Sequence, residues 1–145
     1  MGFVNVDQRD FAYFQRTIKK MDAGISKELN KELRNVIKST IIPAAKANAG
    51  WSSRIPGSIK PVVGTKTIGA RIASRQAPHG RPYEALQKGR RFRSHFRHPV
   101  YGNREVWVNQ RTRPFLAPAF DAKAGEATKA AEAAIDKAAR AAGFK

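Results

Sequence analysis

The chain has 145 residues, enough to build one domain with its own buried core but too few for two independent cores. Its hydrophobic fraction of 41% excludes a compositionally disordered chain, and the lack of cysteine excludes disulfides, thiolate catalysis and cysteine-ligated zinc. Lys and Arg number 28 against 11 Asp and Glu, which gives a formal charge of +17. A charge of this size requires either an anionic neighbour or a very soluble protein.

The positive charge is concentrated in the middle of the chain. Residues 1–50 carry a net charge of +4, residues 51–113 carry +12 and residues 114–145 carry +1. The same three stretches differ in their pattern of apolar, glycine and proline residues. We interpret them as a helical N-terminal part, a sheet with a basic loop, and a corner followed by a C-terminal helix. All three belong to one domain that spans 1–145. The predicted fold class is α+β, with N-terminal helices packed on a small antiparallel β-sheet.

The N-terminal third contains a long stripe of apolar residues at spacings of three and four, which is typical of an amphipathic helix. Glycine weakens a helix interior and proline removes a backbone hydrogen bond, so Ala23-Gly24 is a predicted break and Pro43 a predicted kink. The pattern therefore predicts two consecutive helices, at about 8–22 and 25–48. The stripe consists of Phe11, Phe14, Ile18, Met21, Ile25, Leu29, Leu33, Val36, Ile37 and Ile41.

Beyond Trp51 the chain changes to short apolar runs separated by glycine and proline, which predicts strands. Gly64-Thr65-Lys66 is short enough to form a hairpin turn between the first two runs. Trp107 lies in the last run, where it alternates with two valines, and we expect it in the core. The expected product is one small antiparallel sheet. The four predicted strands are 59–63, 67–74, 83–87 and 104–109.

Residues 90–102 show no clear periodicity, so we expect a long, exposed basic loop there. Arginine beside aromatic rings can contact phosphate and stack on bases, as in single-stranded nucleic-acid binding. The alternatives are a solvated loop or arginines that pair with carboxylates of a neighbouring subunit. Because no nucleic-acid recognition motif accompanies this run, acidic protein partners are favoured. The run contains Lys88, Arg90, Arg91, Arg93 and Arg97 among Phe92, His95, Phe96 and His98.

The stretch from Arg113 to Phe120 reads RPFLAPAF and predicts an apolar corner between a strand and a helix. Pro114 and Pro118 fix φ and remove backbone donors, so a helix can begin only around Pro118. We expect at least two of the three large apolar residues of the corner to pack in the core. The corner could also face an adjoining protomer, since aromatic anchors are common at interfaces. These three residues are Phe115, Leu116 and Phe120.

Two further features bear on contacts. Trp51 lies where the helices give way to the sheet, and it is predicted to be either a core hinge or an interface anchor. The tail from Pro118 is predicted to be a helix in which Asp136 and Arg140 pair at i,i+4. Its alanines would let it lie close to a neighbour while burying little side chain. They are Ala127, Ala131, Ala134, Ala138 and Ala141.

The sequence offers no convincing catalytic, cofactor or metal site. His95 and His98 are three apart, but a metal would usually need a third protein ligand. Asp7 and Asp10 precede an apolar stripe, where acidic residues suit the first turn of a helix. The glycines and lysine of 57–67 lack the Gly-Lys spacing of a phosphate-binding loop, and no serine has a signature that places a base beside it. We therefore expect a protein that is not an enzyme.

The corner also carries a family resemblance. A Pro-Phe-Leu-x-Pro-Ala run before a terminal helix resembles the small neck, or tail-completion, proteins of long-tailed double-stranded-DNA phages, which include head-tail joining and minor tail components. Three other stretches resemble family elements in the right order, so that the similarity spans most of the chain. In the turn at 51–57 this chain departs from the Pro-x-Asp-x-Gly run that the family often has. The three stretches are Ile42-Pro43-Ala44-Ala45-Lys46, Ile55-Pro56-Gly57-Ser58-Ile59 and the seven residues 83–89.

The resemblance implies a structural virion protein that forms a ring at the head-tail junction and lets DNA pass. Six-fold symmetry is expected by analogy, with twelve subunits as the alternative. The implied partners are copies of the chain itself, the head-closure or stopper proteins and the tail terminator or tail tube proteins, with non-specific contact to genomic DNA. No run of about eighteen apolar residues suggests a membrane span, and assembly in the host cytoplasm is expected. The rival interpretation is a stand-alone basic nucleic-acid-binding protein.

The residues expected at interfaces come from the basic run, the corner and the junction between helices and sheet. The arginines would meet acidic surfaces or phosphate, and the apolar residues would anchor a contact. The set is Trp51, Arg90, Arg91, Arg93, Arg97, Arg113, Pro114, Phe115, Leu116, Pro118 and Phe120.

Overall fold

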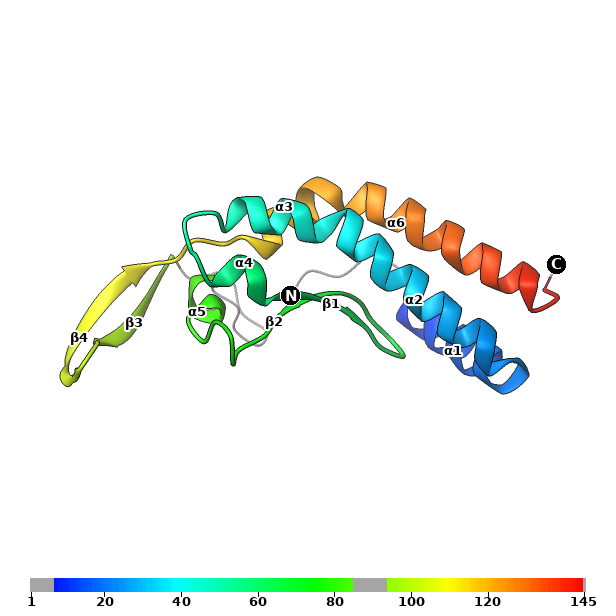
Figure 1. Ribbon diagram of the computed structural model, residues 1–145, viewed down its shortest axis with the longest axis horizontal. Helices are drawn as coiled ribbons and strands as arrows, with labels where there is room; N and C mark the ends of the chain where they lie inside the picture. Colours follow the sequence, from blue (N-terminus) through cyan, green and yellow to red (C-terminus); the bar gives the residue numbers. More distant parts are fainter. Residues whose placement is uncertain (1–6, 85–93, 145) are drawn as a thin grey trace.

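The computed structural model describes residues 7–84 and 94–144. The molecule is elongated: helices form a layer over one β-hairpin, and a second hairpin projects from one end (Figure 1). The α+β class predicted from the sequence is confirmed. In chain order the elements are α1 (Gln8–Met21), α2 (Ala23–Ser39), α3 (Ile41–Asn48), α4 (Ile55–Ser58), β1 (Ile59–Val63), β2 (Ile68–Ile72), α5 (Gly80–Glu84), β3 (His95–Val100), β4 (Asn103–Arg111) and α6 (Leu116–Ala141).

The N-terminal helices begin at aspartates that cap them. The side chain of Asp7 accepts hydrogen bonds from the backbone N–H groups of Arg9 and Asp10, at 2.9 and 3.0 Å. Asp22 caps α2 in the same way through Gly24 and Ile25, at 2.7 and 3.1 Å. Such caps satisfy N–H groups that have no partner within the helix. The first predicted helix is confirmed, and the break after it falls at Asp22.

The second predicted helix is divided in two, which the sequence pattern did not indicate. The helix is interrupted at Thr40, whose hydroxyl donates to the carbonyl of Val36 at 2.6 Å. Pro43 is the third residue of α3. In the first turn of a helix a proline costs no intrahelical hydrogen bond, because the N–H group there has no partner. The break thus replaces the kink predicted at Pro43.

The strands form two separate two-stranded antiparallel sheets instead of the single sheet predicted. Strands β1 and β2 pair from Ile59 with Ile72 to Val63 with Ile68, and the N–H of Gly64 donates to the carbonyl of Thr67 across the turn at 2.8 Å. This hairpin was predicted correctly. The strand predicted at 83–87 is wrong at Tyr83 and Glu84, which belong to α5. The rest of that prediction, 85–87, lies outside the described residues.

The exposed loop predicted at 90–102 is also partly wrong. Residues 95–100 form β3, which pairs with β4, while 90–93 lie outside the described residues. A strand whose two faces both carry polar and charged residues gives no apolar alternation, so the pattern could not reveal it.

The core lies between the helical layer and the β1–β2 hairpin. It contains apolar side chains of α2, α3, β1, β2 and the start of α6, including Phe115, Leu116 and Phe120 at 0%, 0% and 4% exposure. Helix α6 begins at Leu116, with Pro118 in its first turn, as predicted. The apolar corner therefore packs the interior.

Helix α6 lies against α2 and α3 along an alanine face. The buried alanines are Ala127, Ala131, Ala134 and Ala138, whereas Ala141 is exposed. The predicted pair of Asp136 and Arg140 is present at 2.9 Å. Lys137 reaches across to Glu32 of α2 at 2.6 Å, and the hydrogen bond and charge of Glu32 raise the pKa of Lys137.

Candidate interaction surface

Among the elements of the described ranges, the hairpin of β3 and β4 is the most exposed. Its strands pair from His95 with Arg111 to Pro99 with Trp107, and the ladder is irregular between Pro99 and Val100. Gly102 takes φ of +81° at the tip, a conformation that costs glycine little. The two strands pack mainly on each other, and the hairpin extends beyond the helical layer (Figure 1).

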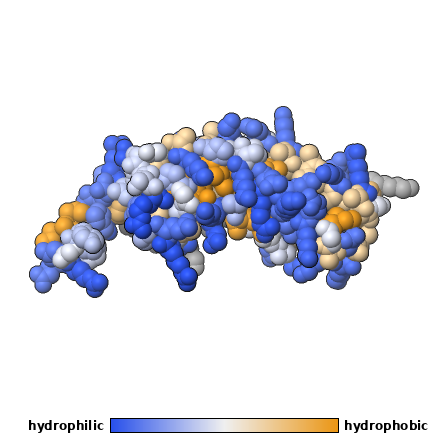
Figure 2. Space-filling model, in the orientation of Figure 1, coloured by the Kyte–Doolittle hydropathy of each residue, from blue (hydrophilic) through white to orange (hydrophobic). Residues whose placement is uncertain are grey.

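Strand β4 is open to solvent on both faces, whereas Phe96, His98 and Pro99 of β3 are half-buried. Every residue of β4 except Gln110 is exposed, including Trp107 at 50% exposure. The prediction that Trp107 lies in the core is therefore wrong, because no second layer formed by residues 7–84 and 94–144 covers the strand. Figure 2 shows apolar residues on the hairpin at one end of the molecule. The large hydrophobic side chains exposed there are Val100, Tyr101, Val106, Trp107 and Val108.

Positive charge accompanies these apolar side chains. The guanidinium carbon of Arg97 lies 5.9 Å from the centroid of the Trp107 ring, within cation–π range. Arg104 and Arg111 are also exposed on β4, whereas Glu105 is the hairpin's single carboxylate. An exposed mixture of aromatic rings and arginines is the composition that protein interfaces favour over the rest of a protein surface.

An aromatic cluster at the base of the hairpin fixes it to the body. The ring of Tyr83 packs against Trp51 at 4.7 Å and against Phe96 at 5.1 Å between centroids. The guanidinium carbon of Arg113 lies 4.8 Å from the centroid of the Trp51 ring. The backbone N–H of Arg113 donates to the carbonyl of Tyr83 at 2.9 Å. Trp51 is 36% exposed, so it is a partly open member of this cluster and not a fully buried hinge.

Glu84 forms a polar anchor through three hydrogen bonds. Its side chain is fully buried and accepts hydrogen bonds from the backbone N–H groups of Phe115, Leu116 and Ala117, at 2.6, 2.9 and 2.8 Å. These N–H groups at the start of α6 have no acceptor within the helix itself, and a carboxylate also complements the positive end of the helix dipole. Glu84 thus caps α6 from a distant part of the chain.

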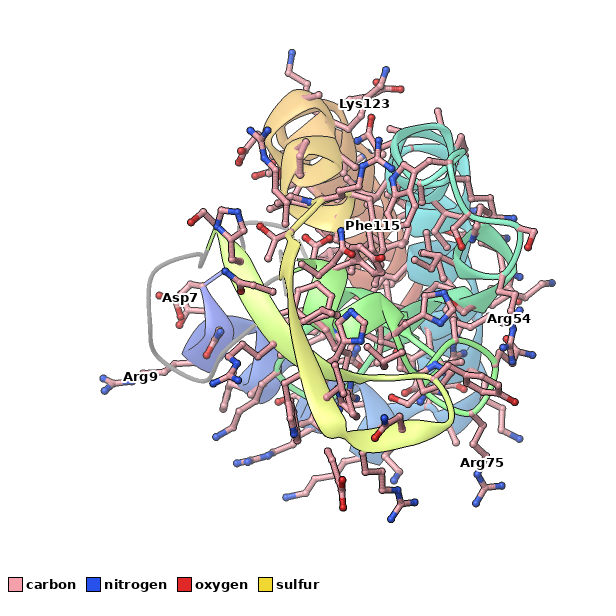
Figure 3. The ribbon with its side chains drawn as sticks, turned by 90° about the vertical axis from the view of Figure 1, so that its left-hand side faces the viewer. Asp7, Arg9, Arg54, Arg75, Phe115 and Lys123 are labelled. Carbon is pink, nitrogen blue, oxygen red and sulfur yellow. The ribbon has the colours of Figure 1, made fainter. Side chains whose placement is uncertain are left out.

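The local sequence explains how Glu84 reaches this position. Gly80 is buried, and a Cβ there would lie 2.9 Å from Cγ2 of Ile72, so that only glycine lets α5 approach β2 so closely. The one-turn helix α5 then directs Glu84 toward the corner. The side-chain amide of Asn48 meets the same corner and donates to the carbonyl of Phe115 at 3.2 Å. Figure 3 shows Phe115 directed to the interior, while Arg54 and Arg75 point outward.

The residues predicted from the sequence as interface candidates fall into three groups: exposed, wholly or partly buried, and outside the described residues. Trp51, Arg97 and Arg113 are exposed near or on the hairpin, and Pro118 is exposed on α6. Pro114 is half-buried, and the three apolar corner residues are buried in the core. The predicted candidates Arg90, Arg91 and Arg93 lie outside the described residues.

Two kinds of residue were missed by sequence reasoning. The exposed hairpin residues Tyr101 and Trp107 could have been suggested by the absence of any further strand to cover β4. Glu84 could not, because a single carboxylate in a loop gives no sign of the helix that it caps. Among residues 7–84 and 94–144, no three His, Cys, Asp or Glu side chains gather to hold a metal ion. No helix in those ranges is both long and apolar enough to cross a membrane.

The chain therefore presents a projecting, solvent-open hairpin that is rich in aromatic and cationic side chains and is anchored to a capped helix. Comparisons with protein-family models, with curated proteins and with solved structures found no match.

Proposed function

We propose that this protein is a structural component of the virion of a long-tailed double-stranded-DNA phage, where it forms a ring at the head-tail junction. The observation that carries the proposal is the β3–β4 hairpin, which exposes Tyr101, Trp107 and three valines to solvent. Exposed apolar patches of this kind mark surfaces that become buried in assemblies. The resemblance of the proline-phenylalanine corner to neck proteins supports this particular assembly.

The proposed role is mechanical and involves no catalysis or cofactor. The ring joins head-closure or stopper proteins on one side to the tail terminator or tail tube on the other, and DNA passes along its axis. An elongated subunit with a projecting arm at one end suits such a ring, because neighbouring copies can be linked through the arm (Figure 1). Six subunits match the symmetry of the tail, and twelve are the alternative.

The basic middle of the chain fits this role through its partners. Arg54, Arg71 and Arg75 are exposed and belong to the stretch that carries a net charge of +12. We propose that these cations face acidic surfaces of adjoining proteins more than DNA, because a strongly cationic channel would retain DNA that has to slide. Contact with genomic DNA is then non-specific and secondary.

The decisive test is cryo-electron microscopy of the virion neck, combined with a phage that lacks this gene. We expect density for a ring of this chain between head and tail, and we expect the deletion to yield filled heads and separate tails that do not join. If the chain is absent from the neck of intact particles, the proposal is overturned.

The second candidate is a stand-alone nucleic-acid-binding protein. The observation in its favour is the pairing of arginine with exposed aromatic rings, as in Arg97 over Trp107, within a strongly basic chain. Footprinting at physiological salt separates the two candidates. Tight, sequence-selective binding by a monomer or dimer would support this candidate and count against the ring.

A further inference from the structure

An apolar groove with an acidic rim lies between α1 and the second half of α6. It has a volume of about 380 Å³, and its apolar lining includes Phe11, Phe14 and Ile135. Four carboxylates border it, which are four of only eleven acidic residues in a chain with a formal charge of +17. The acidic side chains are Asp7, Asp10, Glu132 and Asp136.

Part of this acidic rim is not neutralised by the described chain. Asp136 pairs with Arg140 at 2.9 Å, and Asp7 caps α1. Neither Asp10 nor Glu132 has a lysine or arginine of the described ranges within 4.0 Å. Both are exposed on helices that border an apolar floor. A ligand for this groove should therefore combine apolar and cationic groups.

The β3–β4 hairpin has that combination. Its exposed rings are those of Tyr101 and Trp107, and its exposed cations include Arg97, Arg104 and Arg111. The groove volume lies at the low end of the range of about 300–1,000 Å³ seen for ligand pockets, so it suits inserted side chains and not a whole strand. The hairpin and the groove occupy opposite ends of the elongated molecule, as the positions of β4, α1 and the end of α6 show (Figure 1).

We propose that the hairpin of one protomer docks on the α1–α6 groove of a second copy of this chain, with aromatic side chains on the apolar floor and arginines on the acidic rim. A contact between two different surfaces is heterologous, and copies joined in this way form a ring if the rotation closes. The contact leaves a free hairpin and a free groove at the ends of every open chain, so assembly proceeds until the ring is complete. This proposal rests on the ring proposed above and specifies how the ring is joined.

Cysteine cross-linking tests the contact directly, because the natural chain contains no cysteine. Two single variants are made, Tyr101→Cys on the hairpin and Ala139→Cys in the groove, and they are mixed and oxidised. The matched control replaces Ala139→Cys with Ala133→Cys, which is exposed on the same helix but does not line the groove. We expect a disulfide-linked dimer of the two different variants at least tenfold more abundant with Ala139→Cys than with the control.

Charge reversal adds a test that does not depend on oxidation. Glu132→Lys and Arg104→Glu should each lower the oligomer fraction at least tenfold in sedimentation velocity, and the two together in one chain should restore it. Glu126→Lys serves as the control, because Glu126 lies on α6 outside the groove and pairs only with the exposed Lys123 among the described residues. Circular dichroism of each variant shows whether it is folded.

The outcomes separate this contact from the neck function. Equal cross-linking of the control, or oligomers that survive both single reversals, would overturn the docking while leaving a ring built through other surfaces. An isolated protein that stays monomeric at all concentrations would likewise overturn it. The neck function is decided separately by the presence of the chain in the virion.

Discussion

At the scale of single residues, Glu84 connects two parts of the fold that sequence distance separates. A buried carboxylate is costly unless hydrogen bonds satisfy it, and here three backbone N–H groups do so. The same bonds satisfy the first donors of α6, which has no side-chain cap of its own at Phe115. Glu84 therefore contributes to the position of α6 relative to the hairpin base.

We expect Glu84→Gln to destabilise the protein by about 2–4 kcal/mol, because the amide retains one acceptor and turns an N–H₂ group toward backbone donors. Urea unfolding followed by circular dichroism measures the change. The control is Glu105→Gln on the exposed hairpin, which should change the free energy of unfolding by less than about 0.5 kcal/mol. Equal effects of the two substitutions would contradict the capping role.

Trp107 is exposed, so a substitution there should affect assembly without greatly changing the free energy of unfolding. Its ring is half exposed and stacks with Arg97, so Trp107→Ser should cost no more than about 1 kcal/mol of unfolding free energy. We expect the same substitution to abolish oligomers in sedimentation velocity. Phe120→Ser is the contrasting variant, because Phe120 is buried and its loss should unfold the protein. A Trp107→Ser variant that unfolds would show that the indole side chain of Trp107 belongs to the core.

At the scale of elements, α6 is held in place by the close approach of its alanine face to neighbouring helices more than by the burial of large side chains. Its buried face consists mainly of alanines beyond Phe120, which lets the helix lie close to α2 and α3. Little apolar area is buried per residue, so the capping of the helix start and the pair of Lys137 with Glu32 also help to position it. A helix of this kind tolerates little increase in volume on its inner face.

We therefore expect Ala131→Leu to destabilise the protein by about 1–3 kcal/mol through overpacking against the neighbouring helices. Ala133→Leu, on the exposed face of the same helix, should change stability by less than about 0.5 kcal/mol. Urea unfolding of both variants provides the comparison. If Ala131→Leu were neutral, the close packing of α6 on α2 and α3 would be contradicted.

Most elements were predictable from local patterns. The apolar stripe identified α1 and most of α2 and α3, because it records which helix face is buried, and the turn at Gly64 identified the β1–β2 hairpin. The corner also predicted the start of α6, because Pro118 constrains the backbone by itself. Local rules were sufficient for these elements, each of which has one face against the core.

The errors have a common physical origin. Strand β3 was missed because its two faces carry no apolar alternation, and Trp107 was placed in the core because the sequence does not say whether a further layer covers the hairpin. Alternation of side chains defines two faces of a strand but does not say what lies against either face. Glu84 was missed for the related reason that its partners lie more than thirty residues away in the chain. The candidate surface thus depends on tertiary arrangement.

At the scale of the whole molecule, charge and apolar surface are distributed unequally. The middle of the chain carries +12 of the +17 charge, while four of the eleven carboxylates border one groove at the end opposite the hairpin. A molecule with complementary ends favours association with copies of itself. Its general positive charge favours acidic partners and adds a sequence-independent attraction to DNA.

This distribution predicts the behaviour of the isolated protein toward DNA. We expect weak binding to duplex DNA that is equal for different sequences and is lost steeply as salt rises, because displaced counterions supply the free energy. Fluorescence anisotropy with two unrelated duplexes across a salt series measures both properties. Replacing the exposed Arg54 and Arg75 with serine should lower the salt slope, whereas Trp107→Ser should leave it unchanged. Tight binding at physiological salt that differed between the two duplexes would contradict this expectation and would favour a nucleic-acid-binding protein, because charge attraction alone cannot distinguish base sequences.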